Sequence, residues 1–220
     1  MIIDFKAHIM PGMDKTCKSR IDTIRRLMAA KDAGVDLIVA APVYDPDEST
    51  VEEFLERREK SEDILASLMN EELPDVLPAA MVIYRDSLLT AEGLEKLCFG
   101  DKCFLLSMKD AEWDDTTEAV LRRLTGALGM KVILANAGEA VLKHGEKMQQ
   151  LGVHVLLDLD EIHHKKQIRA FLPFIANGLI SALGSDWESE SPYRFLRKAI
   201  RRMDAAFDTV MCASAKLLGK

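Results

Sequence analysis

The stretch VDLIVAAPVY (residues 35–44) is a near-continuous apolar run, and it decides the fold class. Strands with one face in solvent alternate apolar and polar side chains, whereas strands buried on both faces of a parallel sheet are apolar throughout. Gly34 ends a helical pattern just before the run, and a second helical pattern begins near residue 48. The run therefore predicts a buried strand between two helices of an α/β protein.

The same unit, a short apolar run followed by a helical pattern, recurs along the chain. Seven strands are predicted at residues 1–8, 35–44, 76–84, 103–108, 130–136, 153–159 and 179–185. Helices are predicted at residues 19–33, 48–70, 90–97, 116–128, 138–150, 161–176 and 191–206, with a short helix at the C-terminus. Strict alternation implies a parallel sheet, either closed or open and doubly wound. No glycine-rich nucleotide loop follows a strand, which favours a closed seven-stranded barrel.

The first predicted helix, residues 19–33, has a pattern that predicts its buried face. One face carries the apolar side chains Ile21, Ile24, Leu27 and Met28. Side chains three, four and seven residues apart share one side of a helix, so we expect this face to pack on the sheet. Ser19 or Asp22 suits the N-terminal cap of the helix.

Size and composition limit the possible classes of protein. The 220 residues fit one domain spanning 1–220, and 29 basic against 36 acidic residues give a net charge of −7, which argues against nucleic-acid binding. No apolar run is long enough to span a membrane, and no secretory signal is visible at the N-terminus. The four scattered cysteines suit reduced thiols. We therefore expect a cytoplasmic protein.

Polar side chains gather where the first and last predicted strands end, which is where sites lie in parallel α/β folds. Residues two apart share a strand face, so Lys6 points the same way as His8, and Asp186 the same way as Glu188. In a closed barrel these two strands are neighbours, and Asp14 follows the first one after a Pro-Gly turn. A lysine, a histidine and two or three carboxylates are thus expected to converge.

The opening stretch IIDFKAHIMPGMDKT (residues 2–16) carries a family resemblance. It resembles the pattern M-I-D-I-H-x-H-I-L-P-G-x-D-D-G of the PHP (polymerase and histidinol phosphatase) family, and is most similar to the manganese-dependent tyrosine phosphatases of bacterial capsule and exopolysaccharide biosynthesis. Four later stretches keep the order and spacing of that family: LIVAAPVY (37–44) beside T-I-V-A-T-P-H-Y, ILANAGEA (133–140) beside V-I-A-H-P-E-R-Y, SDWE (185–188) beside S-D-x-H, and ASAKLL (213–218) beside N-x-x-x-L-L.

The resemblance implies a (βα)7 TIM-like barrel of the PHP type, with slight distortion allowed, and a cluster of metal ions that activates water. Three of about nine implied ligand positions are kept, as His8, Asp14 and Asp186. The others depart from the pattern, as Lys6, Val43, Met81, Leu106 or Ser107, Asn136 and Glu188. Valine, methionine and leucine cannot ligate a hard divalent cation. We therefore expect no metal cluster and no cofactor.

Three functions follow as hypotheses. The first is a degenerate, catalytically inactive phosphatase-like protein with a binding or regulatory role, whose implied partner is a tyrosine kinase or a polysaccharide-assembly protein. The second is a hydrolase with a rebuilt site, in which manganese or another divalent metal binds His8, Asp14, Asp186 and Glu188. The third is a pure interaction module whose barrel mouth is filled by Val43, Met81 and Asn136. The ligand, the partner and the oligomeric state are not predicted.

Lys6 itself is predicted to take the electrostatic place of the missing metal, within about 4 Å of Asp186 or Glu188. The alternative, a catalytic lysine with a lowered pKa, needs neighbouring cations rather than carboxylates.

The remaining polar residues are interpreted as structural. DLDEIHH (residues 158–164) suits a helix cap at Asp158 or Asp160, with Glu161 in the first turn and metal binding by His163 and His164 as the alternative. Arg194 and Arg197 on the last predicted helix are phosphate-binding candidates, although a solvated helix face is the simpler interpretation. His144 and His154 are expected to be structural, and Trp113 and Trp187 to lie in exposed loops, with Trp187 near the former pocket.

Overall fold

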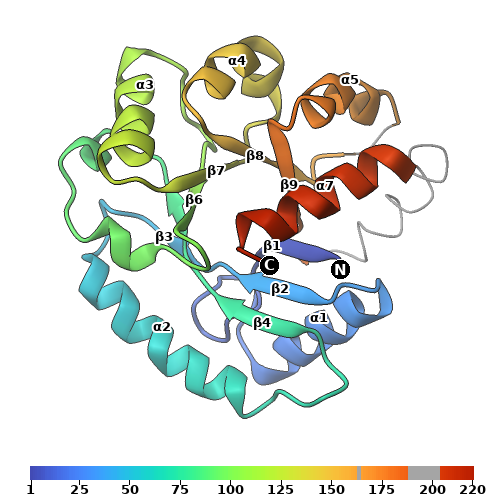
Figure 1. The fold of residues 1–220 in the computed structure, drawn as a ribbon. Helices are drawn as coiled ribbons and strands as arrows, with labels where there is room; N and C mark the ends of the chain where they lie inside the picture. The colour runs from blue at the N-terminus through green and yellow to red at the C-terminus, as the bar shows by residue number, and fades with distance from the viewer. Residues whose placement is uncertain (163–164, 188–203) are drawn as a thin grey trace.

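The computed structural model describes residues 1–162, 165–187 and 204–220 as an α/β fold around a curled parallel sheet (Figure 1). Nine strands contribute to the sheet: β1 Ile3–Ala7, β2 Leu37–Ala40, β3 Val43–Tyr44, β4 Asp75–Pro78, β5 Met81–Ile83, β6 Cys103–Ser107, β7 Lys131–Ala135, β8 His154–Asp158 and β9 Ile180–Gly184. Their order is β3-β5-β6-β7-β8-β9-β1-β2-β4, and the pairs between them are parallel. The predicted α/β class with a parallel sheet is confirmed.

Two of the seven predicted strands are each broken into two segments. The run 35–44 forms β2 and β3, which Ala41 and Pro42 separate, and the run 76–84 forms β4 and β5. Pro42 has no N–H to donate to a neighbouring strand, which explains the interruption. The segments still pair in register, because β2 pairs with β4 and β3 pairs with β5.

Most of the helices lie around the outside of the sheet, while the C-terminal helix lies across it beside β9 and β1 (Figure 1). They are α1 Arg20–Asp32, α2 Val51–Ala66, α3 Asp115–Arg122, α4 Gly138–Gln150, α5 Lys165–Ala176 and α7 Asp204–Leu217, with a π-helical turn at Arg123–Ala127. Ser19 caps α1 and Thr50 caps α2, each with an acidic residue three positions later completing a capping box. None of the helices described has the length and apolar character needed to cross a membrane.

Two helix predictions are corrected, and a third lies mostly outside the described residues. The helix predicted at residues 90–97 is instead two short 3₁₀ helices, Asp86–Leu89 and Leu94–Leu97, and Gly93 between them has a left-handed backbone. The C-terminal helix is not short, because α7 has 14 residues. The helix predicted at 191–206 lies for the most part outside the described residues.

The apolar face predicted for α1 is buried only in part, at Leu27 and partly at Ile24. Ile21 and Met28 are 77% and 54% exposed, whereas Thr23, Arg26 and Leu27 are buried. Hydrogen bonds from two polar side chains orient the helix toward the turn after β1. The Thr23 hydroxyl donates to the carbonyl of Ile9, and the Arg26 guanidinium donates to the carbonyls of His8 and Thr16. The turn after β1 therefore fixes the helix by hydrogen bonds rather than by its apolar stripe.

The apolar core has two layers, one inside the curl of the sheet and one between the sheet and the helices. The inner layer includes Phe5, Leu105 and Ile133, and the C-terminal end of α7 adds Leu217 and Leu218. The Cys103 thiol, at the first residue of β6, donates to the carbonyl of Leu217 at 3.2 Å. The end of α7 therefore closes the amino-terminal end of the sheet and leaves the carboxyl-terminal end for polar groups.

Candidate functional site

The ammonium of Lys6 is the centre of a charged cluster at the carboxyl ends of β1, β8 and β9. Lys6 Nζ lies 2.7 Å from Asp186 Oδ1 and 3.8 Å from Asp160 Oδ2, and it forms an ion pair and hydrogen bond with Asp158 Oδ2. The predicted proximity of Lys6 to Asp186 is confirmed. The partners Asp158 and Asp160 were not predicted.

The cluster is largely removed from water. The side chains of Lys6 and Asp158 are 2% and 3% exposed, whereas Asp160 and Asp186 are 22% and 28% exposed and form its solvent side. Burial alone lowers the pKa of Lys6, but the carboxylates of Asp158 and Asp186 outweigh it, so the pKa lies above its usual value. Lys6 is thus a charged ion-pair partner. Its pKa is shifted upward, whereas a catalytic lysine needs a pKa that is shifted downward.

A glycine gives Lys6 the room to reach Asp158. β9 lies between β1 and β8 in the sheet, and a Cβ atom at Gly184 would stand 2.8 Å from both Lys6 Cβ and Leu156 Cδ1. Real Cβ atoms do not approach other atoms so closely, so a side chain at residue 184 would displace one of these neighbours. The absence of a side chain on β9 thus allows a lysine on one strand to pair with an acid two strands away.

Asn136 connects the cluster to the loop after β8. Its amide Nδ2 donates to Asp158 Oδ2 at 2.9 Å and to Glu161 Oε1 at 3.2 Å, while its Oδ1 accepts from the Ser107 hydroxyl at 3.0 Å. Asn136 has a left-handed backbone with a φ of 53°, a conformation that asparagine tolerates better than most residues. Asn136 is therefore a hydrogen-bonding bridge between the cluster and the loop after β8.

The cap interpretation of the DLDEIHH stretch is wrong for both aspartates. Asp160 accepts from the Asp186 backbone N–H at 2.6 Å and from the Ser185 hydroxyl at 3.1 Å, and α5 begins only at Lys165. Its carboxylate therefore ties the loop after β8 to the loop after β9. His163 and His164 lie outside the described residues.

Asp4 and Trp187 form a second buried contact beside the cluster. Trp187 is 4% exposed, not exposed as predicted, and its Nε1 donates to Asp4 Oδ2 at 2.9 Å. Asp4 Oδ1 also accepts from the backbone N–H groups of Lys6 and Ser185. The Asp4 carboxylate joins β1 to the loop after β9, a role that the sequence interpretation missed.

The acids of the cluster carry more negative charge than Lys6 can neutralise. Burial, together with the charges of Glu161 and Asp160, raises the pKa of Asp158 to about 6 although Lys6 lowers it. Burial likewise raises the pKa of Asp160. Like charges that close resist ionising together, so the Asp158 carboxyl takes up a proton at mildly acidic pH, which relieves the repulsion.

Two other predicted ligands, His8 and Asp14, take part in the turn after β1. The Asp14 carboxylate accepts from the backbone N–H of Met10 at 3.1 Å, and the His8 carbonyl accepts from Arg26, so both residues stabilise the turn after β1. Glu188, Arg194 and Arg197 lie outside the described residues.

The residues present do not fit a cluster of divalent cations. The ammonium of Lys6 already contacts Asp158 and Asp186, and a second cation there would be repelled. Met81 and Leu106 are buried apolar side chains without a donor for a hard metal. Within residues 1–162, 165–187 and 204–220, no three His, Cys, Asp or Glu side chains are arranged to hold a metal ion. Val43 is 40% exposed, so it does not fill the mouth.

The two lone histidines have structural partners, as predicted. His144 stacks on Trp113 with ring centroids 5.2 Å apart, and His154 Nδ1 lies 3.0 Å from the Ser181 hydroxyl. Burial lowers the pKa of His154. Trp113 is partly buried rather than exposed, and its Nε1 donates to Glu118.

The fold and the site together define an α/β protein with a curled parallel sheet and a lysine-centred cluster at the carboxyl ends of its strands. Its structure is similar to the crystal structures of YwqE from Bacillus subtilis and CpsB from Streptococcus pneumoniae, which are unique metal-dependent tyrosine phosphatases. The TM-score is 0.71 at 18% identity, over 99% of this chain and 94% of that chain. The predicted resemblance to this group is thus confirmed at the level of the fold.

A second similar structure is a probable 2-pyrone-4,6-dicarboxylic acid hydrolase from Acinetobacter baumannii with citric acid bound. Its TM-score is 0.48 at 13% identity, over 100% of this chain and 99% of that chain. No protein-family model matches the sequence, and no match to a curated protein was found.

Proposed function

We propose that this chain is a degenerate PHP-type, phosphatase-like protein that has lost metal-dependent catalysis and serves a binding or regulatory role. One observation carries the proposal: the Lys6 ammonium contacts Asp158 and Asp186 at the carboxyl ends of the strands. The family resemblance implies that metal ions bind at that end of the fold. A fixed side-chain cation in their place neutralises acids but activates no water.

Charge and donor chemistry support the loss of the metals. An ammonium supplies one positive charge and three donors, but no open coordination position for water or phosphate. Three acids around one lysine leave a net negative charge, which repels a phosphate ester rather than binding it. The same charge would attract cationic groups, and this suits a binding role better than phosphate hydrolysis.

The strand pairings support the finer fold that the sequence predicts. If β2 with β3 and β4 with β5 are each counted as one broken strand, the eight pairings join seven strands in a ring. We infer a slightly distorted (βα)7 barrel from this ring. Its mouth is the carboxyl-terminal end that holds Lys6.

The two alternative functions are less well supported. A single metal on His8, Asp14, Asp186 and Glu188 would have to displace the Lys6 ammonium from Asp186, or bind beside it against the repulsion between two cations. A mouth filled by apolar packing would need Val43 inside, yet Val43 is exposed and Asn136 is part of a polar network. The implied partner, a tyrosine kinase or a polysaccharide-assembly protein in the cytoplasm, rests on the resemblance alone.

A phosphatase assay tests the proposal. Purified chain with excess manganese should hydrolyse neither p-nitrophenyl phosphate nor a phosphotyrosine peptide. The matched control is Asp186→Ala, which should behave like the wild type. A manganese-dependent turnover of roughly 1 per second, an ordinary rate for an enzyme, that is abolished by Asp186→Ala would contradict it.

A further inference from the structure

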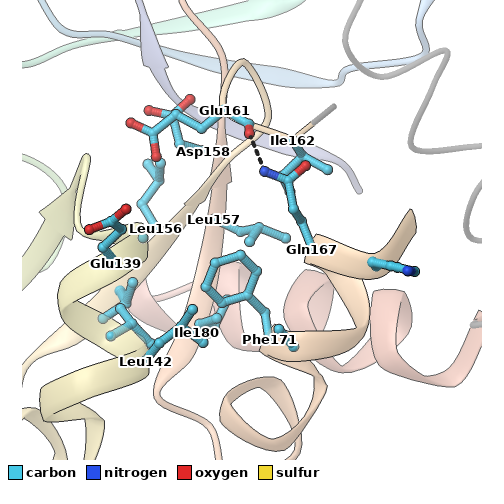
Figure 2. Close-up of a pocket in the computed structure, with 15 residues that line it drawn as sticks. Glu139, Leu142, Leu156, Leu157, Asp158, Glu161, Ile162, Gln167, Phe171 and Ile180 are labelled. Atoms are coloured by element: carbon cyan, nitrogen blue, oxygen red, sulfur yellow. Dashed lines mark hydrogen bonds between the residues drawn. The ribbon is translucent and has the colours of Figure 1, made fainter. Parts of the chain in front are cut away.

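A cavity of about 520 Å³ lies beside the Lys6 cluster, between β8 and the helices α4 and α5 (Figure 2). Its walls are mainly apolar and include Leu142, Leu157, Phe171 and Ile180. Leu157 and Ile180 belong to the core layer between sheet and helices, so the cavity lies mainly outside the curl of the sheet, and it meets the Lys6 cluster at Asp158. Its size lies within the range of about 300–1,000 Å³ that is typical of small-molecule sites.

The polar groups of the cavity gather at one end. Glu161 and Asp158 lie together at the top of Figure 2, above the apolar walls. Asp158 is neutralised by Lys6, whereas Glu161 is exposed and accepts one hydrogen bond from Asn136 Nδ2 at 3.2 Å. The lining carries three acids, counting Glu139, against one base, Lys166. A ligand with an apolar body and a positively charged end would match this distribution of charges.

Gly138 keeps the cavity open at the acidic end. A Cβ atom there would stand 3.2 Å from Glu161 Oε2 and 3.7 Å from the Phe171 ring, so a larger side chain would project between the carboxylate and the ring. Gly138 is the first residue of α4 and does not have the left-handed backbone that requires glycine. Alanine favours a helix more than glycine does, so the open space beside Glu161 is the feature that this glycine provides.

We propose that this cavity binds a small organic ammonium ion with an apolar arm, such as an arylalkylamine. The ammonium would pair with the Glu161 carboxylate at the acidic end of the cavity. The apolar arm would occupy the space between Leu142, Leu157 and Ile180. A neutral or anionic analogue of the same shape loses the charge pairing and should bind more weakly.

The cavity also has a connection to the Lys6 cluster. Glu161 and Asp158 share the donor Asn136 Nδ2, so a ligand that attracts Glu161 would change the hydrogen bonding of Asp158. The proposal goes beyond the proposed function and needs neither metal nor phosphatase activity. Its failure would leave the outcome of the manganese assay unaffected.

Titration with 2-phenylethylammonium, followed by NMR of the methyl and aromatic signals at pH 7, tests this inference. We expect saturable shifts at Leu142 and Phe171, with binding at least about tenfold weaker for 2-phenylethanol and 3-phenylpropionate. Glu161→Gln should weaken ammonium binding by a similar factor. The control Glu146→Gln, at an exposed acid of α4 that does not line the cavity, should leave affinity within twofold.

Two glycine variants separate binding from folding. Gly138→Val should abolish binding by filling the acidic end, and thermal unfolding shows whether the chain still folds. Gly138→Ala should fold at least as well as the wild type, because alanine favours the helix, yet still weaken binding. Equal binding of the alcohol and the amine, no saturable binding, or unchanged affinity in Gly138→Ala and Glu161→Gln would overturn the proposal.

Discussion

The two ends of the curled sheet are closed in opposite ways. At the amino-terminal end, Leu217 and Leu218 from α7 pack into the inner apolar layer with Phe99. At the carboxyl-terminal end, Lys6 pairs with Asp158 and Asp186. Apolar burial stabilises in proportion to the area removed from water, whereas buried charges stabilise only while each one has a partner. The charged end is therefore the more sensitive to single substitutions.

The largest effect is expected from removing the central cation. Lys6→Met keeps the length of the side chain but leaves Asp158 and Asp186 without their ammonium. Breaking a buried ion pair on one side costs about 3–5 kcal/mol, so the free energy of unfolding at pH 7 should fall by about that amount.

Denaturant unfolding of Lys6→Met measures this effect, and Lys31→Met, at a surface lysine 46% exposed, is the matched control. The control should change the free energy of unfolding by less than about 0.5 kcal/mol. A Lys6→Met variant as stable as the control would contradict the account of the charged end.

A substitution at the apolar end should lower the free energy of unfolding by a comparable but smaller amount. Leu217 is 5% exposed, and Leu217→Ala creates a cavity in the inner layer that costs about 2–4 kcal/mol. Leu142→Ala, at a leucine 50% exposed, should cost far less. The loss in Leu217→Ala should be nearly independent of pH between 4 and 7. A loss in Leu217→Ala that changes strongly with pH would remove the contrast between the two ends.

The pH dependence of the charged end follows from Asp158. Its pKa is raised to about 6 in the folded chain against about 3.8 in the unfolded chain, so between these pH values the folded state binds more protons. Stability therefore falls as pH rises from about 4 to about 6, by up to about 3 kcal/mol from this group. Exposed acids with lowered pKa values, such as Glu52 and Asp114, contribute in the opposite direction.

Asp158→Asn isolates this contribution. The free energy of unfolding of both proteins is measured by denaturant titration at pH 4, 5, 6 and 7. As pH rises, the wild type should lose stability relative to the variant. A difference that stays constant with pH, or shifts the other way, would show that Asp158 ionises as an ordinary acid.

The smallest effect is expected at Gly184. Gly184→Ala would place a Cβ atom 2.8 Å from Lys6 Cβ and Leu156 Cδ1, so the neighbours must shift, at a cost of about 1–3 kcal/mol. Gly126→Ala is the control, because nothing lies within 4 Å of a Cβ atom there. Thermal unfolding of both variants measures the difference, and equal melting temperatures would show that β9 does not need the glycine to admit Lys6.

The fold was largely predictable because its signals are local. Near-continuous apolar runs and helical patterns located each strand, and β7 and α4 match their predicted ranges closely. The buried face of α1 was not predictable from periodicity, since hydrogen bonds from Thr23 and Arg26 to the turn after β1 orient that helix. The break at Pro42 was visible in the sequence but was not used.

The site was predictable only in part, because it depends on contacts between distant strands. The approach of Lys6 to Asp186 followed from strand alternation and the proximity of the first and last strands. Asp158 was missed because it stands where a helix cap is also plausible. Its pairing with Lys6 also requires that residue 184 has no side chain. A strand-end acid beside a glycine in the next strand was the available signal.

Calorimetric titration of manganese into metal-free protein at pH 7 tests the central claim most directly, that the Lys6 ammonium holds the place of a metal. The account predicts no saturable heat for the wild type. It predicts the same for Lys6→His, since Val43, Met81 and Asn136 still replace ligands. Stoichiometric manganese binding by the wild type, lost in Asp186→Ala, would contradict it.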